Sequence, residues 1–299
     1  MNSFWINLPP GIQRRAARWL GRRTRRLQAS GPLISFTFDD FPRSALYQGG
    51  AILRKQGFAG TYYASFGLMG QTIATGEIFS AVDLPELVRQ GHELACHTFD
   101  HYDSWQTAPA EFEASILRNR QRLAGLLPGA RFASLSYPIS WPRPQTKRRV
   151  TQYFDCARGG GQTFNAGTMD LNYLKAFFIE QTKGDFNQIK DTIAANASAN
   201  GWLIFATHDV CDSPTRYGCT PEFFRRVVEC AAKSEAAILP VREALSRAQG
   251  AHGPCTAGVS PAGSPSVSLG DGTGGKTPLS PTAKDDRATI AAKCRLACL

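Results

Sequence analysis

Residues 33–40, with the sequence LISFTFDD, form an almost uninterrupted β-prone run that ends at two adjacent carboxylates, Asp39 and Asp40. Such a run is typical of a strand that is buried on both faces, because a strand with one face in water would alternate apolar with polar residues. Parallel α/β folds place their sites at the carboxyl ends of such strands. Successive strand residues point to opposite sides, so we expect one carboxylate to bind a metal and the other to handle a proton.

The rest of the chain repeats this pattern of a buried strand followed by a helix. Further strands are predicted at residues 60–65, 92–96, 131–137, 154–157, 174–179, 201–207 and 236–241, and helices at 44–56, 83–90, 109–127, 185–199 and 220–233. Repeated units of this kind require parallel strands joined by right-handed crossovers. Because seven or eight of them fit into roughly 215 residues, the sequence predicts an irregular (β/α) barrel of seven or eight parallel strands.

Composition divides the chain into three parts. Residues 1–30 contain seven of the arginines that give the protein its net charge of +10, and they are predicted to form a basic amphipathic segment. Residues 31–248 hold the predicted barrel. Residues 249–299 are rich in Gly, Ser, Pro and Thr, so we expect a disordered tail that cannot bury enough apolar surface to fold.

The basic segment leaves two alternatives open. It can be an amphipathic helix that lies on an anionic membrane through residues 1–28, or a solvated helix on the outside of the domain. A nucleic-acid partner is chemically feasible for arginines but is not expected. We find no secretory signal and no run long enough to span a bilayer, and the eight cysteines include no C-x-x-C pair. These features predict a cytoplasmic protein, with membrane association as the open alternative.

A second chemical signal follows the predicted strand at residues 92–96. His97 and His101 are four residues apart, the spacing that places two imidazoles on one face of a helical turn and lets both reach one divalent ion. A carboxylate from elsewhere would complete a site of two histidines and one acid. Such a site leaves coordination positions open for water and substrate, so it can be catalytic.

A third signal is His208, which follows the buried run 201–207, GWLIFAT. All strand ends of a barrel open on one face, so the acid pair, the two histidines and His208 should converge there. Together they supply the requirements of hydrolysis, namely a metal, a base and an acid for the leaving group.

The order and spacing of these motifs resemble the NodB-homology family of polysaccharide deacetylases over about residues 31–246. The family consists of metal-dependent amidases and esterases that remove acyl groups from sugars on a distorted (β/α) barrel. The resemblance implies that Asp39 is the general base and His208 the general acid. It implies that Asp40, His97 and His101 bind a divalent metal, Zn by preference, with Co or Mn as other candidates.

The chain also departs from the family pattern. Phe41 stands where the first motif usually has Gly, and Ser136 stands where the third motif has an Arg that orients the catalytic Asp. We expect Arg158, from the neighbouring strand end, to replace that Arg. Tyr137 and Pro138, in the segment that matches the third motif, are expected to contact the substrate. We find no Asp-Trp pair that corresponds to the fourth motif.

These observations favour a hydrolase that removes N-acyl groups, with N-acetyl preferred, from an amino sugar in an oligo- or polysaccharide or its precursor. One alternative is a deformylase or deacetylase of a lipid-linked sugar, for which the basic segment would supply membrane contact. The other alternative is a glycan-binding protein that has lost catalysis through its altered third motif.

Overall fold

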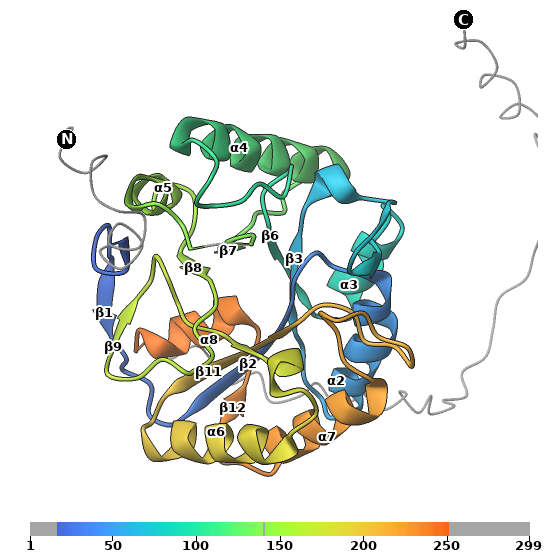
Figure 1. The fold of residues 1–299 in the computed structure, drawn as a ribbon, viewed down its shortest axis with the longest axis vertical. Coiled ribbons are helices and arrows are strands. Elements are labelled where there is room, and N and C mark those ends of the chain that lie inside the picture. Colours follow the sequence, from blue (N-terminus) through green and yellow to red (C-terminus); the bar gives the residue numbers. More distant parts are fainter. Residues whose placement is uncertain (1–16, 140, 251–299) are drawn as a thin grey trace, which may run out of the picture. The chain divides into compact units, whose positions relative to one another are not determined.

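Eight parallel strands form the centre of the structure, a computed structural model that describes residues 17–139 and 141–250 (Figure 1). Seven of them follow one another in the order β10-β11-β2-β3-β6-β7-β8, and the eighth, β12, pairs with the first half of β2. Their bounds are β2 (Leu33–Phe38), β3 (Thr61–Ala64), β6 (Glu93–Cys96), β7 (Ser134–Ser136), β8 (Cys156–Arg158), β10 (Phe177–Phe178), β11 (Trp202–Thr207) and β12 (Ala237–Ile238).

The seven strands curve into a half-barrel, and backbone contacts link its two ends. The segment that leads into β10 runs beside the end of β8, where Arg158 and Leu174 form an isolated parallel bridge. The amide of Gly159 donates to the carbonyl of Leu174 at 3.0 Å. This arrangement confirms the predicted (β/α) barrel, and its irregularity lies in the short strands on the β7 to β10 side.

Helices cover the outside of the strands (Figure 1). They are α2 (Ala51–Lys55), α3 (Asp83–Arg89), α4 (Pro109–Leu126), α5 (Pro144–Val150), α6 (Phe186–Ser198), α7 (Pro221–Ala232) and α8 (Val241–Ala248), with the short turns η1 (Ala45–Gly50), η2 (Phe66–Leu68) and η3 (Ile179–Thr182). Side chains cap two of them, because Asp185 accepts from the Asn187 amide at the start of α6 and Thr220 from the Phe223 amide at the start of α7. No helix in the described residues is long and apolar enough to cross a bilayer.

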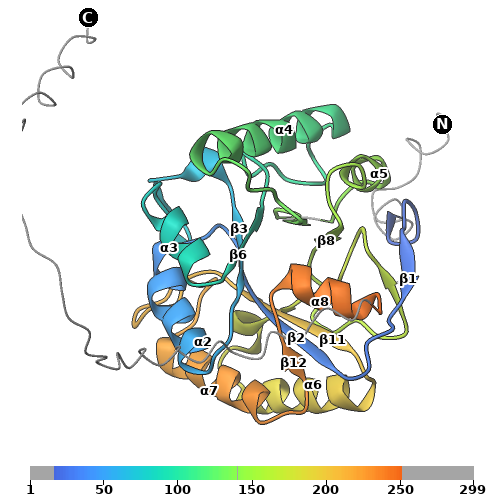
Figure 2. The ribbon, with the colours of Figure 1, turned by 180° about the vertical axis from the view of Figure 1, so that it is seen from behind.

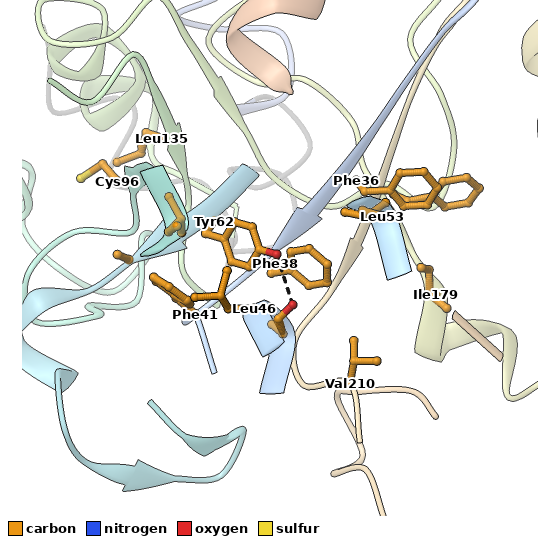
Figure 3. Packing of buried hydrophobic residues seen from close by; sticks show 14 of the residues in the cluster. Phe36, Phe38, Phe41, Leu46, Leu53, Tyr62, Cys96, Leu135, Ile179 and Val210 are labelled. Atoms are coloured by element: carbon orange, nitrogen blue, oxygen red, sulfur yellow. Dashed lines mark hydrogen bonds between the residues drawn. The ribbon is translucent and has the colours of Figure 1, made fainter. Parts of the chain in front are cut away.

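The alternation of side chains along β2 produces two apolar layers. Phe36 and Phe38 point outward and pack against Phe224 of α7, with ring centroids 5.7 and 5.6 Å apart. Figure 3 shows Phe38 beside Tyr62 and Phe41 in this outer layer. Leu33 points the opposite way, into the barrel, where it belongs to a second cluster that includes residues of β11 and α8.

Helix α8 closes the amino-terminal end of the barrel (Figure 2). Its first two backbone amides donate to side chains at the starts of β3 and β6, from Val241 to Thr61 Oγ1 and from Arg242 to Glu93 Oε2, both at 2.9 Å. The predicted strand at residues 236–241 was therefore too long, because the strand ends at Ile238 and the helix begins at Val241. Only the carboxyl ends of the strands remain for a site.

Part of the basic segment belongs to the fold. Residues Thr24–Arg26 form β1, which pairs antiparallel with β9 (Thr168–Asp170) on the side of the barrel. The side chain of Arg23 donates to the carbonyls of Phe154 and Asp155 at 3.1 and 2.6 Å. The predicted basic segment at 1–30 therefore overlaps the barrel domain. Residues 1–16 and the tail from 251 on lie outside the described residues, and the expectations for them stay predictions.

Candidate active site

The carboxyl ends of β2, β6, β8 and β11 supply the predicted site residues. Asp39 and Asp40 follow β2, His97 follows β6, Arg158 ends β8, and His208 follows β11. The first four are nearly completely buried, which is unusual for charged groups unless they are paired. Strands far apart in the sequence thus bring these side chains to one end of the barrel.

Asp40, His97 and His101 form a compact group of potential metal ligands. One ligand atom from each lies within 4.8 Å of the others. Asp40 Oδ1 is 3.0 Å from His101 Nε2 and 3.5 Å from His97 Nε2, so both imidazoles present the same nitrogen to the carboxylate. Two imidazole nitrogens and one carboxylate oxygen are a donor set that Zn and similar divalent ions accept. The residues present therefore fit the metal that the sequence implied.

Neighbouring groups fix the orientation of these ligands. The Thr75 hydroxyl, in the turn between β4 (Thr72–Ile73) and β5 (Gly76–Glu77), donates to Asp40 Oδ2 at 2.9 Å. His97 Nδ1 lies 2.9 Å from the carbonyl oxygen of Ser136, so in the tautomer that donates there His97 Nε2 is free to bind a metal. Thr75 and the Ser136 carbonyl carried no sequence motif and were not predicted.

The backbone conformation that brings His97 and His101 together differs from the predicted one. Residues 97–101 are not helical, and Thr98 and His101 have positive φ angles of 62° and 54°. The Ser115 hydroxyl of α4 anchors this loop, because it accepts from the amides of Phe99 and Asp100, both at 3.0 Å. The predicted pairing of His97 with His101 is therefore present, but the helical turn proposed for it was wrong. Left-handed residues held by their surroundings are common at functional sites.

Asp39 forms an ion pair with Arg158 and is not part of the metal-ligand group. The Arg158 guanidinium donates to Asp39 Oδ1, and the two side chains are 1% and 6% exposed. Burial alone would raise the pKa of Asp39, but Arg158 and the imidazoles of His97 and His208 outweigh it and hold that pKa below its usual value. Asp39 is consequently an ionised carboxylate. Its neighbour Asp40 also has a lowered pKa, because the hydrogen bond from His101 and the nearby imidazoles outweigh burial.

His208 approaches the same end of the barrel from β11. Its Nδ1 lies 3.1 Å from the carbonyl oxygen of Tyr217, which leaves Nε2 without a hydrogen-bond partner among the described residues. The loop that carries Tyr217 is held by Asp209, whose carboxylate accepts from the Thr215 amide and hydroxyl at 2.8 and 2.6 Å. Asp209 therefore has a structural role in this loop.

The two predicted substrate contacts, Tyr137 and Pro138, are both buried. Tyr137 is 5% exposed and packs in the outer core, where its ring stacks with that of Tyr173 at 6.1 Å. Pro138 is buried, and its carbonyl accepts from the Ser104 hydroxyl at 3.0 Å. Both residues support the wall of the barrel in this structure, and a direct contact with substrate stays a prediction.

Glu180 was missed by the sequence analysis. It lies in η3, immediately after β10, and the charges of Asp39 and Arg158 act on its carboxyl. The rule that found Asp39 and His208, a polar residue directly after a buried strand, applies equally to Glu180.

The fold and the site together define an α/β barrel with a candidate divalent-metal centre. The sequence model of the family described as polysaccharide deacetylase matches residues 26–156. Over these residues the chain is similar to this family, as the NodB-homology resemblance predicted. A search of the curated proteins finds no match.

Several solved structures share the fold at low sequence identity. A CE4 family pseudoenzyme from Bacillus anthracis has a TM-score of 0.52 at 8% identity, covering 74% of this chain and 67% of that one. The Xyl-CE4 domain of a multidomain xylanase from the hindgut metagenome of Trinervitermes trinervoides has a TM-score of 0.50 at 18% identity, with 74% and 92% covered. A family 4 acetyl xylan esterase from Clostridium thermocellum, in complex with a cobalt ion, has a TM-score of 0.50 at 18% identity, with 72% and 90% covered.

Proposed function

We propose that this protein is a metal-dependent hydrolase that removes N-acyl groups, N-acetyl in the first place, from an amino sugar in an oligo- or polysaccharide or its precursor. The observation that carries the proposal is the placement of an ionised, non-ligating carboxylate beside a group of three metal-ligand atoms within 4.8 Å of one another. Similarity of residues 26–156 to the polysaccharide deacetylase family supports hydrolysis of an acyl bond on a sugar.

Asp40, His97 and His101 would hold the metal, Zn by preference and Co or Mn as alternatives. When bound, a divalent ion supplies a Lewis acid that polarises the acyl carbonyl and makes water easier to deprotonate. The Thr75 hydroxyl and the Ser136 carbonyl keep two of these ligands in position.

Asp39 would be the general base of the reaction. Its ionised carboxylate takes a proton from the water that adds to the acyl carbon, and the ion pair with Arg158 keeps it ionised until then. We assign to Arg158 the function of keeping Asp39 ionised, in place of the Arg in the family's third motif.

His208 would be the general acid. Its protonated Nε2 gives a proton to the amine nitrogen as the carbon–nitrogen bond breaks, so that acetate and a free amino sugar leave the site. In that protonated form Nδ1–H donates to the Tyr217 carbonyl, which holds the ring in place during the transfer.

Acetate release from tetra-N-acetylchitotetraose tests the proposal. The purified protein should release acetate, lose this activity on treatment with a chelator and regain it when Zn or Co is added back. Acetylated xylan should be run beside it, because an ester preference would replace the amide assignment. No acetate from either substrate with a fully loaded metal site would overturn the hydrolase proposal and favour the glycan-binding alternative.

One observation favours the lipid-linked sugar as a second candidate substrate. Trp19 is 73% exposed, and the guanidinium of Arg22 lies 5.2 Å from its ring centroid. An exposed Trp beside arginines is suited to the headgroup region of an anionic membrane. Trp19→Ser should then weaken binding to anionic vesicles while Val82→Ser, at a residue that is 74% exposed, should not. Equal binding by both variants would refute membrane contact through this surface. A cytoplasmic location stays a prediction.

A further inference from the structure

Glu180 lies near the residues of the proposed reaction, because the charges of Asp39 and Arg158 act on its carboxyl. Two residues before it, the Phe178 ring lies 6.3 Å from the ring of His208 and 5.8 Å from the Arg158 guanidinium. The intervening Ile179 packs in the outer core. Glu180 lies in η3, the 3-10 helix that begins directly after β10.

The carboxyl of Glu180 has unused hydrogen-bonding capacity. Its Oε2 is buried and has no hydrogen-bond partner among the described residues. The same is true of Arg158 Nε, although that guanidinium binds Asp39 through another nitrogen. Buried polar atoms are nearly always paired in native proteins, and exceptions are concentrated where a ligand binds. One donor and one carboxyl oxygen are thus available beside the proposed general base.

The surroundings keep Glu180 protonated. Burial raises the pKa of Glu180 to about 8, and the negative charges of Asp39 and Asp209 act in the same direction. A hydrogen bond from its own backbone amide and the positive charge of Arg158 oppose this rise only in part. The Cys219 thiol also faces this carboxyl, and the charge of Glu180 contributes to the raised pKa of Cys219. A carboxyl that is neutral at pH 7 can donate a hydrogen bond, which an ionised one cannot.

We propose that Glu180 is a specificity-determining residue that contacts the sugar directly and donates a hydrogen bond from its carboxyl O–H to a neutral oxygen, a ring hydroxyl or the acylamino carbonyl. The proposal rests on the proposed function, because it names how that same site recognises its substrate. Arg158 Nε–H can donate to the same sugar unit. A neutral donor of this kind adds no second negative charge beside Asp39, so the base keeps its lowered pKa.

Steady-state kinetics with tetra-N-acetylchitotetraose, as a function of pH, test the role. Glu180→Gln keeps a neutral donor, so at pH 7 its kcat/KM should stay within about twofold of the unsubstituted protein. Glu180→Ala loses the donor and should lower kcat/KM roughly three- to tenfold, mainly through KM. The alkaline limb of the profile should move to higher pH in Glu180→Gln, because this side chain cannot ionise. Glu235→Gln, at an exposed position, serves as the control.

Two results would overturn the assignment. One is a Glu180→Ala protein with unchanged KM at pH 7. The other is a Glu180→Gln protein that is as impaired as Glu180→Ala and keeps the original alkaline limb, since that would show a need for the ionised carboxylate. Melting temperatures of both variants identify any loss that comes from misfolding.

Calorimetric binding separates this proposal from the proposed function. In a His208→Ala background, which lacks the general acid, the tetrasaccharide should bind with a Kd that rises roughly three- to tenfold above pH 8 when Glu180 is present and stays flat in Glu180→Gln. That result supports the Glu180 contact even if the protein releases no acetate. A pH-independent Kd in both proteins refutes the contact even if acetate is released.

Discussion

Arg158 and Asp39 form a buried ion pair across the barrel, from the end of β8 to the end of β2. Ser136, where the sequence analysis noted the absence of an Arg, is the direct partner of Arg158 in the parallel pairing of β7 with β8. Arg158 therefore lies one strand along the barrel from Ser136, and from there its guanidinium reaches the carboxylate after β2.

Replacing Arg158 should weaken the base. Arg158→Met removes the positive charge that lowers the pKa of Asp39, so the carboxylate would keep its proton to higher pH. We expect turnover at pH 7 to fall at least about tenfold and the acidic limb of the pH–rate profile to move up by roughly one unit or more. Arg131→Met is the control, because its partner Asp155 lies on the surface.

The variant also carries a risk to folding, because removal of one partner from a buried ion pair leaves an uncompensated charge. If Arg158→Met does not fold, Arg158→Lys keeps the charge without the planar guanidinium and should show a smaller shift in the same direction. An acidic limb at the same pH in a folded Arg158 variant would exclude Arg158 from the function of Asp39.

The two adjacent acids should give opposite phenotypes. Asp39→Asn keeps all three metal-ligand groups, so the protein should retain its metal while kcat falls by about two to four orders of magnitude. Asp40→Asn removes a ligand and should lose metal and activity together. Metal content measured alongside acetate release distinguishes them, and wild-type turnover by Asp39→Asn would refute the base assignment.

Thr75 should contribute to metal affinity through Asp40. Thr75→Val deletes the hydroxyl that donates to Asp40 Oδ2 and should weaken Zn binding by roughly 10- to 100-fold in competition with a chromogenic chelator. His97→Ala should abolish tight binding altogether. Thr72→Val is the matched control, because Thr72 lies in the same β4–β5 turn region and is exposed. Unchanged affinity in Thr75→Val would show that Asp40 needs no orienting partner.

Phe41 combines an unfavourable backbone angle with favourable packing. Its φ is 56°, and its ring is fully buried. The centroid of this ring lies 4.7 Å from that of Phe79 and 5.0 Å from that of Tyr62. Phe41→Ala should cost about 3–5 kcal/mol in the free energy of unfolding, because it removes the ring and keeps the angle. Phe41→Gly, the usual family residue, should be about 1 kcal/mol more stable than Phe41→Ala in urea unfolding. An Ala variant as stable as the Gly variant would rule out strain at this turn.

His92 should make the protein sensitive to acid. Its Nδ1 accepts from the Gly60 amide at 3.0 Å, which requires the neutral ring, and burial followed by the charge of Arg54 lowers its pKa to about 4. Between pH 6.5 and 4 the unfolded chain therefore binds a proton that the folded chain does not, so stability is complete above pH 6.5 and falls as pH drops.

The protonation of His92 should lower the free energy of unfolding by up to roughly 3 kcal/mol over this range. His92→Gln should abolish most of this decrease. Urea titrations at several pH values measure it. Both proteins keep His97, whose pKa burial also lowers to about 4, so the difference between them isolates His92. Identical pH dependence would show that His92 accepts a proton without cost.

The parts of the fold that could be predicted are those that a continuous stretch of apolar residues in the sequence identifies. The apolar runs before Asp39 and His208 are long enough to identify β2 and β11, and the spacing of His97 and His101 suggested their pairing, although not the backbone that produces it. Helix α8 was missed, although its residues are mostly good helix formers and follow Pro240. The contacts of its first two amides with Thr61 and Glu93 are tertiary and leave no local pattern.

The parts of the site that could not be predicted depend on tertiary contacts. Left-handed backbone at Thr98 and His101 is imposed by the Ser115 anchor on α4, which is distant in sequence. The contact between Arg158 and Asp39 could be suggested from strand order, but it also needs the register of β7 with β8. The burial of Tyr137 in the outer core is likewise a matter of tertiary packing that no local pattern reveals.

The pairing of β1 with β9 determines how the protein can be shortened in the laboratory. A recombinant version that begins at the first barrel strand would leave one edge of β9 unpaired and would remove Arg23, which binds the carbonyls of Phe154 and Asp155. An exposed strand edge favours association between copies. Expression trials should therefore start no later than Ala17, and a version that starts at Gly31 is expected to yield aggregates in size-exclusion chromatography.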